Sequence, residues 1–244
     1  MSRRSRRERA EADQLRRLLL IGGGVSAVAA VGATWLVTRP ATFPALSGAG
    51  TLSERLGQVG PSPHHQQLTG SGVDLLVISD TGCAFCRDFV RTGLDPLIRF
   101  AEQGGLSAAY LSVGFGRSGL ISTIAAACLD PARSRLSGPD RVRALFDMTE
   151  AGLPDEAAPE AVIGEAASGL GASRTALSRC VPEAALTFRD RFEATRRLFE
   201  LERTPTFYLS VPGGTGRILK LEGFTTTSAL TGRLERALET EGQA

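Results

Sequence analysis

The stretch around Cys83-Ala84-Phe85-Cys86 constrains the fold more than any other part of the chain. An uncharged apolar run, 75–78, precedes it, and it is followed by apolar residues at helical spacing: Phe89, Val90, Leu94, Leu97 and Ile98. This order predicts a buried strand, a tight turn and a helix that holds both cysteines in its first turn. Free backbone N–H groups and the helix dipole favour an anion at a helix N-terminus, so we expect a reactive thiolate at Cys83. Cys86 lies one turn further along the same side, within reach of a disulfide bond to Cys83.

A second motif lies far downstream, at Thr204-Pro205. The proline opens an apolar and β-branched run, 206–209, and proline is found at the first residue of a strand but not inside a central strand. Cis peptide bonds are almost confined to the bonds that precede proline. The second motif matters because a Cys-x-x-Cys pair alone also fits half of a zinc site or two structural cysteines.

Together the two motifs resemble the thioredoxin superfamily, in which a cis Thr-Pro or Val-Pro pair faces the Cys-x-x-Cys turn. The 205 − 86 = 119 residues between Cys86 and Pro205 exceed what a bare thioredoxin needs, and the intervening composition is helical. In this respect the chain is similar to the DsbA-type thiol–disulfide oxidoreductases, which carry a helical domain inserted in a thioredoxin core. The resemblance covers about Val73 to the C-terminus.

The resemblance assigns roles to the residues of both motifs. It implies that Cys83 is the attacking cysteine and that Cys86 resolves the mixed disulfide. Substrate contacts are expected from the residues between and opposite the cysteines: Ala84, Phe85, Thr204 and Pro205. No cofactor and no metal ion is expected.

The expected fold class is α/β: a thioredoxin-like core with an inserted helical subdomain, preceded by a single N-terminal transmembrane helix. The core comprises 73–117 and 202–244, with strands at 73–79, 106–113, 206–211 and 217–221. Its helices are expected at 86–103, bent at Asp95-Pro96, and from Thr225 onward. The insertion, 118–201, is expected to hold helices at 120–129, 141–150, 156–168, 173–180 and 182–201. In the last of these, an apolar stripe is predicted to be core: Phe188, Phe192, Thr195 and Phe199.

The N-terminus has the pattern of a membrane anchor. Residues 1–17 are rich in arginine, whereas 18–38 contain no charge and are long enough to span a bilayer as a helix. Positive flanks remain in the cytoplasm and Trp35 suits the interface, so the domain that follows is expected on the extracytoplasmic side, the periplasm. A cleaved signal peptide is the alternative, although the apolar run is longer than an ordinary signal core. Arginine greatly exceeds lysine, which is typical of a GC-rich bacterial genome, so the expected location is the bacterial cytoplasmic membrane.

Residues 39–72 are rich in proline, glycine, serine and threonine, and are predicted to be a tether with one short element near 52–59. His64 and His65 lie in this stretch and are expected to be solvated.

Two positions depart from the family pattern. Relatives often hold a buried acid six residues before the first cysteine, where this chain has Val77. Asp80 is expected either to serve as a proton relay in its place or to cap the turn. Phe85 stands where strongly oxidising relatives often have histidine, and it cannot stabilise a thiolate by charge, so a weaker oxidant is expected.

The other two cysteines, Cys128 and Cys180, fall in the helical insertion. Two separate buried thiols are one reading, because free cysteine packs as a small hydrophobic residue. A structural disulfide is favoured by the even cysteine count, by the expected oxidising location and by similarity to relatives that carry such a bond.

The leading hypothesis is an extracytoplasmic oxidase that exchanges disulfides with protein substrates through Cys83 and Cys86. Its expected partners are protein thiols, a membrane redox protein of the quinone reductase type, and the membrane itself. The alternatives are a tethered thiol reductase for cytochrome or metal-site maturation, and a metal-binding module that uses the two cysteines as soft ligands. The net charge of +2 gives no reason to expect nucleic acid, and a monomer is expected.

Overall fold

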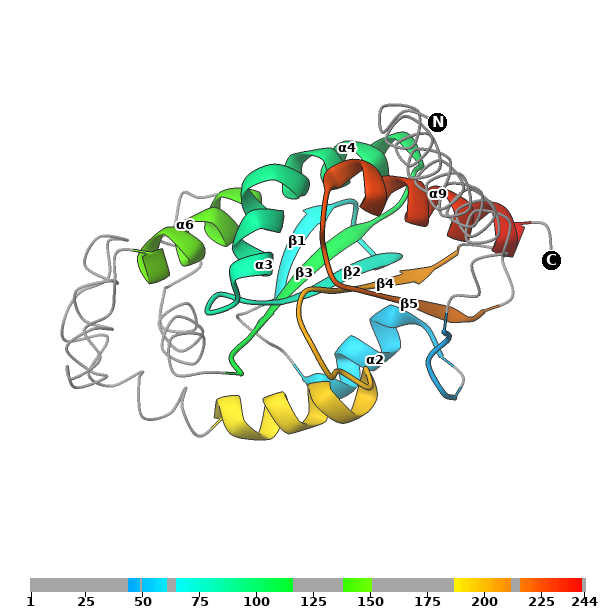
Figure 1. The fold of residues 1–244 in the computed structure, drawn as a ribbon. Coiled ribbons are helices and arrows are strands. Elements are labelled where there is room, and N and C mark those ends of the chain that lie inside the picture. Colours follow the sequence, from blue (N-terminus) through cyan, green and yellow to red (C-terminus); the bar gives the residue numbers. More distant parts are fainter. Residues whose placement is uncertain are drawn as a thin grey trace, which may run out of the picture. The chain divides into compact units, whose positions relative to one another are not determined.

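A five-stranded mixed sheet forms the centre of the fold, with strand order β1-β3-β2-β4-β5 (Figure 1). The computed structural model describes residues 44–48, 50–60, 65–115, 138–150, 187–211 and 216–242, all within one compact unit, Phe43–Ala244. The strands are β1 (His65–Thr69), β2 (Leu75–Asp80), β3 (Ala108–Val113), β4 (Thr206–Ser210) and β5 (Ile218–Glu222). β2 and β3 run parallel, and the other three neighbouring pairs run antiparallel.

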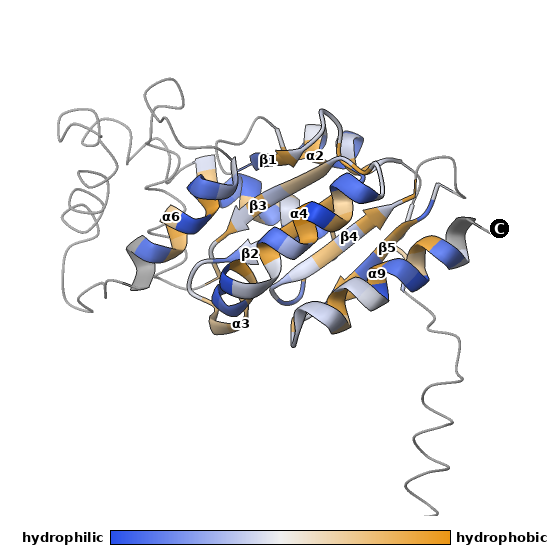
Figure 2. Cartoon of the chain, turned by 90° about the horizontal axis from the view of Figure 1, so that it is seen from above, coloured by the Kyte–Doolittle hydropathy of each residue, from blue (hydrophilic) through white to orange (hydrophobic). Residues whose placement is uncertain are grey.

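Successive side chains of the strands point to opposite faces of the sheet and contribute to two separate cores, one on each face. One core includes Val77 and Phe207, and their sequence neighbours Ile78 and Tyr208 belong to the other. Helices α3 (Ala84–Asp88), α4 (Leu94–Gln103), α6 (Gly138–Glu150) and α9 (Thr227–Gly242) contribute to the first core. Helix α2 (Leu52–Val59) and a helix over 187–198 cover the opposite face (Figure 1). Figure 2 shows hydrophobic and hydrophilic residues alternating along α4 and α9, as expected for helices with one buried side.

The segment after the cysteines is helical throughout but irregular in its middle. A π-helical turn, η1 (Phe89–Gly93), joins α3 to α4. The irregularity therefore lies just before Asp95-Pro96, where the sequence predicts a bend. Gly93 is needed at this turn, because a Cβ atom there would lie 2.8 Å from ring atoms of both Phe89 and Phe224.

The described part of the expected tether belongs to the folded unit, which corrects the boundary at residue 72. Helix α2 occupies the predicted 52–59 and begins with a capping box between Thr51 and Glu54. Before it, Leu46 N donates to Ile218 O, so the chain already contacts the edge of β5 at this point. β1 was not predicted, because His65–Thr69 is a polar edge strand without the alternation of a half-buried one.

Most of the other predicted elements are confirmed to within a few residues. β2, β3, β4 and β5 match the four predicted strands, and the terminal helix begins at Thr227 instead of Thr225. The predicted stripe is core, since Phe188, Thr195 and Phe199 are buried and Phe192 packs against the second core. Helices predicted at 120–129, 156–168 and 173–180 lie outside the described residues.

The predicted membrane anchor, 18–38, also lies outside the described residues. Within the part of the chain that the structure describes, we find no helix that is both long and apolar enough to cross a bilayer.

Candidate active site

Cys83 lies where the chain leaves β2 and enters α3, as the sequence predicts. It is the N-cap residue of α3, with extended backbone angles of φ −91° and ψ 125°. Its backbone N donates to Asp80 O at 3.0 Å, and its carbonyl accepts Arg87 N at 3.1 Å. Cys83 is half-buried and Cys86 is fully buried, and both are free thiols. One sulfur therefore faces the surface while the other is enclosed by the core.

The two sulfurs have opposite acidities. Hydrogen bonding from the Cys86 thiol, with contributions from backbone N–H groups and the Thr204 side chain, lowers the pKa of Cys83 to about 6. Burial raises the pKa of the Cys86 thiol far above its usual range, and the neighbouring Cys83 raises it further. At neutral pH, Cys83 is therefore mainly a thiolate and Cys86 a thiol, which suits the first for attack and the second for donating a hydrogen bond.

The loop before β4 faces the cysteines. The Thr204–Pro205 peptide bond is cis, as predicted. The carbonyl oxygen of Thr204 lies 3.4 Å from Cys83 Sγ, which brings together two motifs that are far apart in the sequence. A backbone hydrogen bond fixes the position of this loop, because Gly223 N donates to Pro205 O at 2.8 Å.

Asp80 caps the turn, which is one of the two roles expected for it. Its carboxylate accepts Gly82 N through Oδ1 at 2.9 Å and Phe115 N through Oδ2 at 3.0 Å. The residue is buried, and its own backbone N donates to Cys86 Sγ at 3.5 Å. The carboxylate thus holds the turn and the end of β3 together.

Asp80→Ala is expected to lower the free energy of unfolding by about 1–3 kcal/mol, because two backbone N–H groups near the site lose their acceptor. Urea unfolding of the reduced protein measures this change. Asp95→Ala is the matched control, since Asp95 forms an exposed ion pair with Arg143 and should contribute at most about 1 kcal/mol. Equal effects of the two substitutions would contradict the structural role of Asp80.

Two large aromatic side chains are exposed, one in the cysteine turn and one at the end of β3. Phe85, between them, is 62% exposed, and Phe115, which follows β3, is 43% exposed. Phe115 also makes an edge-to-face contact with Phe192, at 5.2 Å between ring centroids. The sequence did not single out Phe115, because its backbone contact with Asp80 depends on the pairing of β2 with β3.

The remaining predicted site residues, Cys128 and Cys180, lie outside the described residues. Within the described ranges, no group of three or more histidine, cysteine or acidic side chains converges as a metal site would. His65, expected in a solvated tether, is instead part of β1, and burial lowers the pKa of its imidazole.

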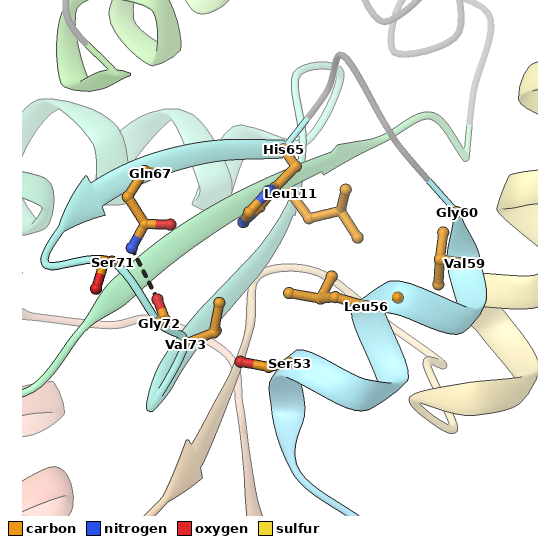
Figure 3. Close-up of a pocket in the computed structure, with 11 residues that line it drawn as sticks. Ser53, Leu56, Val59, Gly60, His65, Gln67, Ser71, Gly72, Val73 and Leu111 are labelled. Atoms are coloured by element: carbon orange, nitrogen blue, oxygen red, sulfur yellow. Dashed lines mark hydrogen bonds between the residues drawn. The ribbon is translucent and has the colours of Figure 1, made fainter.

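The imidazole of His65 lines a pocket of about 320 Å³ between α2 and β1 (Figure 3). Its other lining residues include Leu56, Gln67 and Leu111. None of the residues that line it belongs to the cysteine site, so the pocket is separate from the two cysteines.

Comparisons with known proteins identify the fold. No protein-family model and no curated protein matches the chain. Among solved structures, Wolbachia pipientis α-DsbA1 matches with a TM-score of 0.53 and 13% identity, over 74% of this chain and 94% of that one. A protein-disulfide isomerase from Novosphingobium aromaticivorans matches with a TM-score of 0.53 and 14% identity, over 73% and 99%. The chain therefore has the mixed α/β, thioredoxin-like fold of DsbA structures.

Proposed function

We propose that this protein is a thiol–disulfide oxidoreductase that exchanges disulfides with protein substrates through Cys83 and Cys86. The observation that carries the proposal is the pairing of a half-buried thiol of lowered pKa with a buried thiol of raised pKa, opposite the Thr204 carbonyl. The fold supports it, because the structures that share this fold are named DsbA and protein-disulfide isomerase.

In the oxidase direction, a substrate thiolate attacks Cys83 Sγ of the Cys83–Cys86 disulfide. A bond forms between the substrate sulfur and Cys83, the bond to Cys86 breaks, and its electron pair leaves on the Cys86 sulfur, which takes up a proton. A second substrate thiolate then attacks the substrate sulfur of the mixed disulfide and expels Cys83 as a thiolate. The substrate loses two electrons, the cysteine pair gains them, and one proton remains in solution. The reverse sequence is the reductase reaction.

The substrate is proposed to lie as an extended peptide along the loop at Thr204–Pro205. Backbone groups of such a loop offer hydrogen bonds to any sequence, as in strand addition. Ala84 and Phe85 are exposed at the other side of Cys83 and are proposed to contact the same peptide.

The oxidase direction is favoured by the acidity of Cys83. A stabilised thiolate favours the reduced pair and so makes the disulfide a better oxidant. A pKa of about 6 lies between roughly 7 in thioredoxin and roughly 3.5 in DsbA. A reduction potential between roughly −270 and −120 mV is therefore expected, less oxidising than DsbA, in line with Phe85 in place of histidine.

The setting of this activity is part of the proposal. The apolar segment 18–38 is proposed to anchor the chain in the bacterial cytoplasmic membrane with the cysteines on the extracytoplasmic side. A membrane protein of the quinone reductase type would reoxidise the pair, and Cys128 would pair with Cys180 in a compartment where disulfides persist.

Mixing the oxidised protein with a reduced dithiol peptide tests the proposal. The peptide should become oxidised while one disulfide per protein is lost, with Cys83→Ser as the inactive control. Equilibration with glutathione buffers then gives the reduction potential. A reduction potential at or below that of thioredoxin would favour the reductase direction. The absence of any disulfide exchange would exclude both the oxidase and the reductase.

A further inference from the structure

Two buried hydroxyl groups lie beneath Cys86. Neither takes part in the hydrogen bonds described above for the cysteine turn and the Thr204–Pro205 loop. Ser79 is on β2 and Tyr110 is on β3, and both side chains are fully buried. Tyr110 pairs in register with Val77, two residues before Ser79 on the same face of β2. Val77 and Tyr110 belong to the same core as Cys86, so both hydroxyls lie on the side of the sheet that carries the cysteines.

Neither hydroxyl is satisfied, because among the described residues no hydrogen-bond partner of suitable geometry is present for Ser79 Oγ or for Tyr110 OH. A buried polar group without a partner costs about 1–3 kcal/mol, and such groups are rare in folded proteins. Two of them side by side under a reactive sulfur therefore require an explanation.

Their surroundings connect them to Cys86. The Ser79 hydroxyl lies close enough to Cys86 and to Tyr110 to lower the pKa of each group, although the geometry of a hydrogen bond is met at neither. Burial keeps the pKa of Tyr110 well above its usual range, and the charges of Cys86, Asp80 and Cys83 raise it further. Tyr110 therefore remains a hydrogen-bond donor at any pH at which the protein works.

Exchange in either direction needs a thiolate at Cys86. It is the leaving group when a substrate attacks the Cys83–Cys86 disulfide, and it is the nucleophile when the mixed disulfide is resolved. Burial disfavours this anion, and the backbone N of Asp80 is one donor that faces it. Both carboxylate oxygens of Asp80 are turned to backbone N–H groups, those of Gly82 and Phe115.

We propose that Tyr110 and Ser79 form a hydrogen-bond chain, from the Tyr110 hydroxyl to Ser79 Oγ and from the Ser79 hydroxyl to Cys86 Sγ, that stabilises the Cys86 thiolate during exchange. This inference rests on the proposed function. Ser79 would contact the reacting sulfur, and Tyr110 would act as a positioning residue through Ser79. Donors fixed in a dry core stabilise a developing charge without the reorganisation that water needs. No proton leaves the hydroxyl pair, because the proton of Cys86 is exchanged with the substrate thiolate and the solvent.

An aromatic disulfide reagent that releases a coloured thiolate separates the two steps. Reduced protein releases one coloured thiolate when Cys83 attacks the reagent, and a second when Cys86 resolves the mixed disulfide. Cys86→Ser stops after the first release and so identifies the second phase. Ser79→Ala and Tyr110→Phe should leave the first phase unchanged and slow the second by roughly 10- to 100-fold, the effect of a lost hydrogen bond to a charged group. The midpoint of the second phase should rise by about one pH unit or more in Ser79→Ala.

Tyr208→Phe is the matched control for Tyr110→Phe. Tyr208 is an equally buried tyrosine on β4, which is separated from β3 by β2, but its hydroxyl donates to Phe199 O at 2.8 Å on the opposite face. Tyr208→Phe should therefore lower the melting temperature and leave the second phase unchanged, whereas Tyr110→Phe should slow the second phase and leave the melting temperature unchanged. In the double variant Ser79→Ala/Tyr110→Phe, the second phase should be no slower than in Ser79→Ala.

An unchanged second phase in both single variants would overturn the proposed hydrogen-bond chain, and so would an equal slowing of the second phase in Tyr208→Phe. Neither result would affect the proposed function. Additive losses in the double variant would also overturn it, because they would show two independent effects. The absence of a first phase in the unaltered protein would instead overturn the proposed function together with this inference.

Discussion

Replacement of Cys83 by serine is expected to reduce disulfide exchange to the background rate. The hydroxyl of serine does not ionise near neutral pH and cannot form a disulfide, so neither the attack nor the mixed disulfide is possible. Cys86→Ser should behave differently, because Cys83 remains reactive while the resolving thiol is lost. This variant should accumulate mixed disulfides, which intact-mass spectrometry detects as adducts on Cys83. Accumulation of adducts in Cys83→Ser instead would reverse the assignment of the two roles.

Phe89→Ala is expected to be the most destabilising single change near the site, at about 3–5 kcal/mol. Phe89 is fully buried in η1, and its ring lies edge-to-face against Phe207 and Phe224, at centroid distances of 5.1 and 5.4 Å. Removing it leaves a cavity where the helix after the cysteines meets β4 and the segment before α9. Denaturant unfolding of the reduced protein measures the loss.

Phe85→Ala is the control for this prediction. Phe85 is four residues earlier on the same helical segment, but it is 62% exposed, so its removal should change stability by no more than about 0.5 kcal/mol. Similar losses in the two variants would show that the ring of Phe89 does not contribute through packing.

Local sequence patterns were enough to predict the elements that carry the cysteines. The apolar run of β2, the spacing of Phe89, Leu94 and Leu97, and the proline before β4 each depend on residues close in sequence. That the loop before β4 lies against Cys83 was expected only from the family resemblance. The contact between Cys83 Sγ and Thr204 O agrees with that expectation.

The features that escaped prediction depend on contacts between distant segments. β1 is a polar strand whose Gln67 side chain donates to the carbonyls of Thr69, Gly72 and Ala108, so its place is fixed by hydrogen bonds and not by a hydrophobic pattern. Buried Arg55 ties α2 to Leu198 O and Ser47 O, although an arginine in a short segment looks like a surface residue.

The hydroxyl pair was also invisible in the sequence. Ser79 and Tyr110 read as ordinary strand residues, and only the parallel register of β2 and β3 brings them together beneath Cys86. The same register decides the role of Asp80, since its carboxylate reaches the end of β3 only because Asp80 pairs with Val113.

The pH dependence of Cys83 alkylation tests the central claim most directly. Only the thiolate reacts, so the rate should rise through a midpoint near pH 6 and level off by about pH 7, where roughly nine-tenths of Cys83 is ionised. Peptide mapping after labelling at pH 6 should place the label on Cys83 and leave Cys86 unmodified. A midpoint near the ordinary thiol value of 9.0, or earlier labelling of Cys86, would contradict the account.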